Sequence, residues 1–142
     1  MELTLLKSSI YPNPEADQEM HHFTYSFAPH TGDWKDAGIP NMAYDLNVPA
    51  RTAKGLGNAE MQPFVAVNAE NIVVEVVKRA QNGSGIVVRM YENFGRRTNV
   101  HVTPGFQWNS VESVNLLEQK LADASLDLTF HPYEIKTLLF RK

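Results

Sequence analysis

The feature that most constrains this fold is a series of short, β-branched runs that begins near residue 63 and continues to the carboxy terminus. Within these runs apolar and polar residues alternate, as Leu126, Leu128 and Phe130 do with their polar neighbours. We predict strands over residues 64–67, 72–79, 85–92, 99–103, 110–117, 126–131 and 133–141. Several short strands with turns between them and almost no helix predict an all-β fold, an antiparallel β-sandwich of two packed sheets.

The turn between the two Val-rich runs is the clearest local signal. Residues 81–84 read Gln-Asn-Gly-Ser. Asn-Gly tolerates the positive φ angles of a tight turn, so this segment predicts a β-hairpin between residues 72–79 and 85–92.

The first 62 residues have a different composition, rich in turn formers and aromatic residues. Residues 3–7 predict a short strand, and residues 22–28 predict a second one with Phe23, Tyr25 and Phe27 on one face. Residues 34–46 predict a short irregular or helical stretch, interrupted by Gly38 and Pro40.

Residues 49–62 predict a mobile loop, and the composition changes at its end. The Gly55-x-Gly57 in this loop lacks the strand-to-helix context of a phosphate cradle. The composition shift divides the chain into residues 1–62 and 63–142.

Charge and composition exclude several classes of function. The net charge of −3 gives no basic face for nucleic acid. No apolar run approaches the roughly 20 residues that cross a bilayer, and no basic amphipathic helix suits a membrane surface. There is no cysteine, and the amino terminus, with an acid at Glu2, does not read as a secretory signal. We therefore expect a cytoplasmic protein.

Three histidines raise a metal hypothesis. His21 and His22 are adjacent, so on a strand they point to opposite faces and cannot easily bind one ion together. His30 has Asp33 nearby but no recognisable ligand spacing. We predict no metal ligand here, although a small metal-dependent hydrolase built on these histidines is one alternative.

Carboxylates, aromatic residues and one arginine are the other candidates. Glycoside hydrolysis requires two carboxyl groups about 5–10 Å apart, a pairing that the spacing of these residues does not indicate, so we predict no catalytic residue. The carboxylates on predicted strands are expected to be exposed: Glu75, Glu92, Glu112 and Glu134. Aromatic residues that could stack on sugars, or pack in the core, are Trp34, Tyr91, Trp108 and Tyr133. Arg89 stands mid-strand, where it faces either solvent or an interface with a carboxylate or hydroxyl-rich ligand.

Five segments, residues 3–17, 22–34, 74–80, 85–92 and 132–138, together resemble the bacterial α-mannosidases of glycoside hydrolase family 38. Residues 22–34 are similar to the His-x-Phe-Thr-Tyr-x-x-x-Pro-His-x-Gly-x-Trp stretch of that family, and residues 3–17 are similar to the segment before it. The paired strands at 74–80 and 85–92 and the closing residues 132–138 are also similar. The five segments occur in the same order over nearly the whole chain, whereas residues 54–62 match nothing in the family.

The resemblance implies a carboxy-terminal, non-catalytic domain of a retaining, zinc-dependent α-mannosidase. Residues 1–62 would be the tail of the central, galactose-mutarotase-like β-sandwich, and residues 63–142 the terminal β-sandwich. Zinc and the aspartate nucleophile would belong to the catalytic domain of the same polypeptide, and this segment would hold no cofactor. By the same resemblance, Arg89 would be a substrate-binding residue facing the α-mannoside glycan, without a catalytic role.

Two expectations remain open beside this one. The chain could instead be a free-standing carbohydrate-binding or adhesion sandwich. If the chain is instead a domain separated from a larger enzyme, a homo-oligomer is also open, because the separation exposes an apolar docking face.

Overall fold

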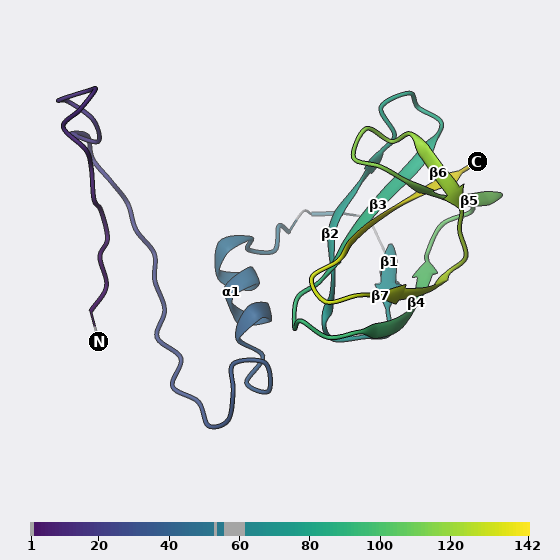
Figure 1. Cartoon of the computed structure of the whole chain (residues 1–142), viewed down its shortest axis with the longest axis horizontal. Coiled ribbons are helices and arrows are strands. Elements are labelled where there is room, and N and C mark those ends of the chain that lie inside the picture. Colours follow the sequence, from purple (N-terminus) through teal and green to yellow (C-terminus); the bar gives the residue numbers. More distant parts are fainter. Residues whose placement is uncertain (1, 53, 56–61) are drawn as a thin grey trace. The chain divides into compact units, whose positions relative to one another are not determined.

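A computed structural model describes residues 2–52, 54–55 and 62–142 of the chain. The chain forms two compact units, Met1–Arg51 and Thr52–Lys142, which are described separately below (Figure 1). The predicted boundary after residue 62 directly follows residues 56–61, which lie outside the described residues together with part of the Gly55-x-Gly57 motif. That boundary stays a prediction.

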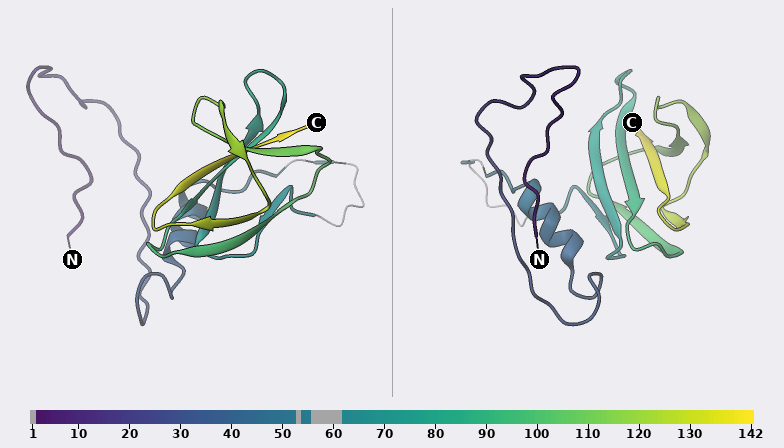
Figure 2. Two further views of the ribbon diagram at one scale, coloured as in Figure 1. Left: turned by 45° about the vertical axis from the view of Figure 1, so that its right-hand side comes forward. Right: turned by 60° about the vertical axis from the view of Figure 1, so that its left-hand side comes forward.

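The second unit is an antiparallel β-sandwich (Figures 1 and 2), which confirms the predicted fold class. One sheet has three strands in the order β1-β4-β7, and the other has five in the order β2-β3-β8-β5-β6. The strands are β1 Val65–Val67, β2 Ile72–Arg79, β3 Gly85–Glu92, β4 Thr98–Pro104, β5 Ser110–Val114, β6 Lys120–Asp123, β7 Asp127–Phe130 and β8 Ile135–Arg141.

The core lies between the two sheets and follows the period-two pattern of the strands. Alternate residues of β3, such as Val88 and Met90, face it, and Phe130 of β7 meets them from the other sheet. Each such side chain stabilises the fold by about 1.5–3 kcal/mol through burial. The buried members are Ile72, Val88, Met90, Val100, Val102, Val111, Phe130, Leu138 and Phe140.

A second, smaller cluster contains the alternate residues of the five-stranded sheet. Val87 and Leu139 are register partners on β3 and β8, and both are fully buried. The Glu118 carboxylate ties the nearby turns together, because it pairs with the Lys78 ammonium and accepts the Gln81 N–H. Because this second cluster lies on the face opposite the main core, strands β3 and β8 are buried on both faces. Burial on both faces explains why their sequences are nearly continuous apolar runs.

The predicted strands agree with the structure where the pattern was local and strong. The bounds of β2 and β3 are those predicted, and the hairpin between them forms with Gly83 at φ 74°. The segment 110–117 is shorter than predicted, since β5 ends at Val114. There Asn115 Oδ1 accepts the N–H groups of Leu117 and Gln119 and turns the chain into β6, a strand of exposed residues that the sequence did not predict.

The described residues of the first unit form one helix, α1 Ile39–Asn47. The prediction of a short helical stretch is confirmed, but Gly38 and Pro40 begin the helix rather than interrupt it. Gly38 is the N-cap residue with φ 66°, and proline is accepted in the first turn because its missing N–H has no intrahelical partner there. Among the described residues no helix is long and apolar enough to cross a membrane.

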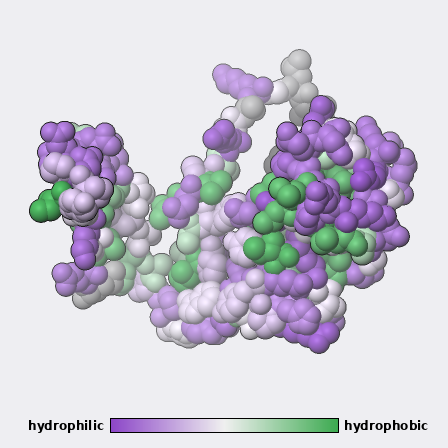
Figure 3. Space-filling model, turned by 45° about the horizontal axis from the view of Figure 1, so that its top comes forward, coloured by the Kyte–Doolittle hydropathy of each residue, from purple (hydrophilic) through white to green (hydrophobic). Residues whose placement is uncertain are grey.

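The predicted strands at residues 3–7 and 22–28 were wrong for this structure, in which both segments are irregular. A strand needs a neighbouring strand to take up its N–H and C=O groups, and the described part of this unit provides none. Their apolar side chains, including Leu3, Phe23, Tyr25 and Phe27, are exposed. Figure 3 shows apolar residues among the polar ones on the visible surface.

The core makes a direct prediction about stability. Phe140 is 1% exposed and meets the rings of Phe106 and Trp108 edge to face. Phe140→Ala should lower the free energy of unfolding by about 3–5 kcal/mol, because it removes a large buried ring and leaves a cavity. Urea denaturation followed by circular dichroism measures this loss.

The matched control is Leu121→Ala at a side chain that is 66% exposed, where we expect a change within about 0.5 kcal/mol. Equal losses in the two variants would contradict this assignment of the core.

Candidate functional site

Arg89, the predicted substrate-side residue, lies on the face of the five-stranded sheet opposite the sandwich core. Its neighbours Val88 and Met90 both point into the core, so Arg89 points the other way. The side chain is half-buried, and its Nε donates to Thr137 Oγ1 on β8 at 3.1 Å. Arg89 is therefore fixed against its own sheet by one neutral hydrogen bond, and its substrate role stays a prediction.

The same face carries two carboxylates in ion pairs. The pKa of Glu118 is lowered, mainly by the hydrogen bond from Lys78, and the charge of Arg89 contributes weakly. Glu112 lies near the carboxy-terminal end of β8, where Arg141 Nε approaches it at 2.8 Å and Lys120 Nζ at 3.2 Å. The prediction that Glu112 is exposed was wrong, since it is only 9% exposed, and the Arg141 hydrogen bond is the main cause of its lowered pKa.

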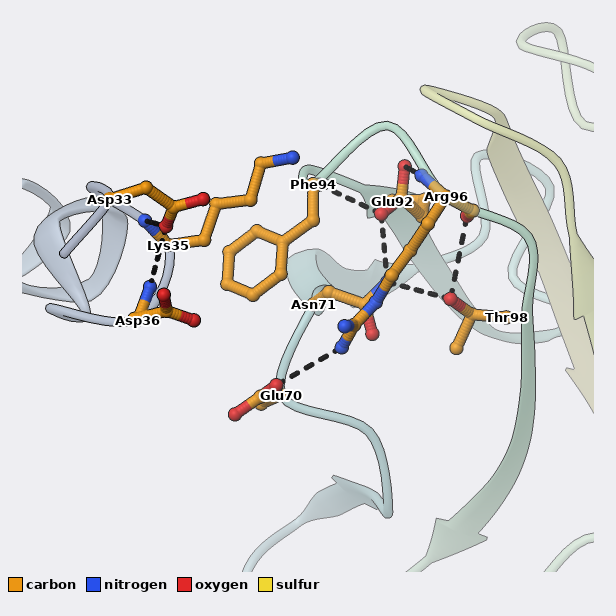
Figure 4. A network of polar contacts seen from close by, with 9 residues as sticks. All are labelled: Asp33, Lys35, Asp36, Glu70, Asn71, Glu92, Phe94, Arg96 and Thr98. Atoms are coloured by element: carbon orange, nitrogen blue, oxygen red, sulfur yellow. Dashed lines mark hydrogen bonds and ion pairs between the residues drawn. The ribbon is translucent and has the colours of Figure 1, made fainter.

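The side chain of Glu92, at the end of β3, accepts five hydrogen bonds (Figure 4). It was predicted to be exposed, but only 1% of its surface is accessible. Oε1 accepts the Asn71 side-chain amide and the Phe94 N–H, each at 2.7 Å. Oε2 accepts three further backbone N–H groups, from Gly95 at 2.8 Å, Arg96 at 3.2 Å and Tyr133 at 2.9 Å.

These bonds join the segments that pass between the two sheets. Residues 93–97 connect β3 to β4 and residues 131–134 connect β7 to β8, and both connections run from one sheet to the other. Asn71 closes the third such connection, before β2, and its amide also donates to Thr98 Oγ1 on β4 at 2.7 Å. One carboxylate thus fixes three crossings at the same end of the sandwich.

The local sequence allows this arrangement at two unusual backbone positions. Gly95 has φ 71°, a left-handed conformation that glycine adopts without strain. Tyr133 has φ 58° although it carries a large side chain. Its ring lies against Gly95, because a Cβ placed on Gly95 would come within 2.5 Å of Tyr133 Oη and 2.7 Å of Cζ.

The electrostatics of Glu92 follow from the balance of two effects. Burial raises its pKa, whereas the hydrogen bonds from Tyr133, Asn71, Phe94 and Arg96 stabilise the anion. The hydrogen bonds prevail, and the pKa falls from 4.5 to about 2. Glu92 is therefore a permanent anion at neutral pH.

Sequence reasoning missed Glu92, although a signal was present. On a strand, residues two apart point to the same face, so Glu92 shares its face with the apolar Val88 and Met90. Asn93-Phe94-Gly95 directly after the strand supplies the turn that brings backbone N–H groups back to the carboxylate.

The other predicted candidates do not assemble into a site. His21 contacts the Asp17 carbonyl through Nε2, and Asp33 accepts the N–H groups of Lys35 and Asp36. Among the residues that the structure describes, no three His, Asp or Glu side chains form a group that could hold a metal ion.

The aromatic candidates divide by exposure. Trp108 packs edge to face on Phe140, at the border of the core, and Tyr91 is half-buried. Trp34, in the first unit, is 42% exposed with Lys35 Nζ over its ring. Tyr133 is 67% exposed and is the only one of the four whose backbone the Glu92 carboxylate binds.

Comparisons with known proteins identify relatives along almost the full chain. The Glycosyl hydrolases family 38 C-terminal beta sandwich domain matches residues 71–138. Alpha-mannosidase 2C1 of Mus musculus is 30% identical over 98% of this chain, and Alpha-mannosidase G of Dictyostelium discoideum is 32% identical over 97%. An Alpha-mannosidase of Saccharomyces cerevisiae is 25% identical over 85%. The chain spans only 13–14% of the length of these relatives.

Glu92 gives a prediction that depends on pH. A lowered folded-state pKa stabilises the fold above the unfolded value of 4.5, and this stabilisation disappears as the pH falls towards about 2. The shift corresponds to about 3 kcal/mol at pH 7. Glu92→Gln should therefore lower the free energy of unfolding by about that amount at pH 7 and by less than half of it near pH 3, as measured by urea denaturation at each pH.

Glu75→Gln is the control, because Glu75 is an exposed carboxylate of β2 with the same substitution chemistry. We expect it to change stability by less than about 0.5 kcal/mol at either pH. A Glu92→Gln effect that is the same at both pH values would contradict the role of the ionised carboxylate.

Proposed function

We propose that this chain, whose residues 71–138 match the C-terminal beta sandwich domain of glycosyl hydrolases family 38, is the non-catalytic carboxy-terminal part of a larger α-mannosidase. The observation that carries the proposal is the family match over residues 71–138 in a chain that spans only 14% of its α-mannosidase relatives. In the intact enzyme it would support the catalytic domain and shape one side of the glycan site.

The chemistry of the two buried carboxylates supports a non-catalytic role. A glycosidase requires one carboxylic acid whose pKa is raised so that it can protonate the leaving group. The pKa values of Glu92 and Glu112 are both lowered, and the oxygens of both are occupied by hydrogen bonds or ion pairs. Neither is available as a general acid.

The metal and the nucleophile belong, in this proposal, to the rest of the parent enzyme. The described residues of this chain do not gather a ligand set for zinc. A zinc ion in the catalytic domain would help to bind the sugar hydroxyls, and an aspartate there would form the covalent intermediate of a retaining reaction.

The domain division is also part of the proposal. Residues 1–62 would complete the preceding central sandwich, and residues 63–142 would form the terminal one. In support, residues 22–28 alternate like a strand yet have no strand to pair with among the described residues, and Phe23, Tyr25 and Phe27 are exposed. Strands of the same polypeptide would provide both the hydrogen bonds and the apolar cover.

Arg89 keeps its proposed role as a substrate-side residue without catalytic function. Its single neutral hydrogen bond to Thr137 leaves guanidinium N–H groups for the hydroxyl oxygens of an α-mannoside. A cytoplasmic location is proposed from the absence of cysteine.

One observation favours the second candidate, a free-standing carbohydrate-binding sandwich. Tyr133 presents an exposed aromatic ring on a rigid turn, which is a common device for sugar recognition.

Two measurements test the proposal. The coding sequence before the Met1 codon should continue in phase for several hundred codons and encode a His-x-Asp zinc motif. The 142-residue chain alone should not release 4-nitrophenol from 4-nitrophenyl α-mannoside, whereas the protein from the whole reading frame should.

A stop codon followed by a ribosome-binding site directly before the Met1 codon would overturn the assignment to a larger enzyme. Hydrolysis by the 142-residue chain alone, at a rate similar to that of the longer protein, would overturn its non-catalytic role.

A further inference from the structure

Tyr133 combines features that the fold itself does not require. It lies in the turn between β7 and β8 and is 67% exposed, so burial does not account for its large ring. Its backbone has φ 58°, a conformation that costs roughly 1–2 kcal/mol for a residue with a Cβ. A glycine or asparagine would occupy this position at lower cost.

The surrounding structure fixes this ring in place. The Tyr133 N–H donates to Glu92 Oε2 at 2.9 Å, and the same oxygen holds the backbone of Gly95 and Arg96. One side of the ring lies against Gly95, where a Cβ would fall within 3.0 Å of three of its atoms. The Tyr133 ring thus packs against the backbone of Gly95, and the buried Glu92 carboxylate binds the N–H of that glycine.

A ring that is already fixed loses little conformational entropy when a ligand stacks on it. The ligand class that suits such a surface combines an apolar face with polar edges, which describes a pyranose ring. Arg96 and Arg97 directly follow Gly95 in the loop that Glu92 holds, and both are exposed. Their guanidinium N–H groups are the kind of donor that the hydroxyl oxygens of a sugar require.

The two arginines differ in availability. The guanidinium of Arg96 donates to Glu70 at 3.0 Å and lies over the Phe94 ring. The structure records no side-chain hydrogen bond or ion pair from Arg97 to the described residues, so Arg97 is the better donor for a ligand.

We propose that Tyr133 and Arg97 form a pyranose-binding platform at the end of the sandwich that Glu92 closes. Tyr133 stacks on the apolar face of the sugar ring, and Arg97 donates hydrogen bonds to its hydroxyl groups. Gly95 and Glu92 are positioning residues, which act only through the place of the Tyr133 ring. The choice of mannose as the sugar rests on the proposed function, whereas the platform itself rests on the geometry.

The test titrates the 142-residue chain with methyl α-mannoside and follows the backbone amides by ¹H–¹⁵N NMR. We expect saturable shifts confined to residues 93–97 and 131–134, with a dissociation constant in the millimolar range. Tyr133→Ala should weaken binding about tenfold or more, Arg97→Ala should weaken it less, and Tyr133→Phe should preserve it.

Tyr25→Ala is the matched control, because Tyr25 is 68% exposed and lies in the other unit. It should leave the titration unchanged. Unchanged core amide signals establish that the Tyr133 variants are folded, and if Tyr133→Ala is not, Arg97→Ala and Tyr133→Phe still decide the outcome.

Three results would overturn the platform. The first is no change in the amide chemical shifts at saturating sugar, and the second is chemical-shift changes centred outside residues 93–97 and 131–134. The third is an equal loss of sugar affinity in Tyr25→Ala and Tyr133→Ala. If Tyr133→Ala instead changes the association state while sugar has no effect, the ring belongs to a protein contact. The reading frame and the hydrolysis assay decide the proposed function independently, so either proposal can fail while the other stands.

Discussion

The sandwich depends on one buried anion that holds three connections between its sheets. Main-chain hydrogen bonds hold each sheet together, and apolar contacts hold the two sheets to each other. Neither fixes the path of the chain where it crosses from one sheet to the other. Glu92 does so with five N–H donors, from Asn71, Phe94, Gly95, Arg96 and Tyr133. Because these donors meet the carboxylate where water is excluded, each bond is strong and none can be replaced easily.

This role separates Glu92 from the chemistry that the family name suggests. A catalytic carboxylate must exchange a proton or attack a sugar carbon, and therefore needs an open oxygen and a pKa suited to that step. Glu92 has neither, because its oxygens are occupied and its pKa is about 2. The buried Glu92 is therefore a structural anchor, in a chain that spans 14% of the length of its α-mannosidase relatives.

The sequence predicted those parts of the fold that depend on neighbouring residues only. The strands 72–79 and 85–92 and the turn at Gly83 are set by local alternation and by glycine's backbone freedom. Residues 22–28 have the same alternation but pair with no strand among the described residues. Alternation predicts which face of a strand would be buried, but it does not predict what covers that face. Glu92 was misjudged because a charge is exposed by default, and its five donors come together only in the folded chain.

The inference about binding rests on Tyr133 because the fold explains the backbone of this residue but not its side chain. The carboxylate binds the N–H of residue 133, and this bond would form whatever side chain that residue carried. The fold thus explains Glu92 and Gly95, whereas it does not explain the aromatic side chain of Tyr133, which lies against Gly95. Arg89 was the candidate from sequence because a charge within a strand is conspicuous, yet its hydrogen bond to Thr137 gives it a place in the sheet. Of the two, the exposed ring is the feature that contacts within the sandwich explain less, and the proposed platform therefore rests on it.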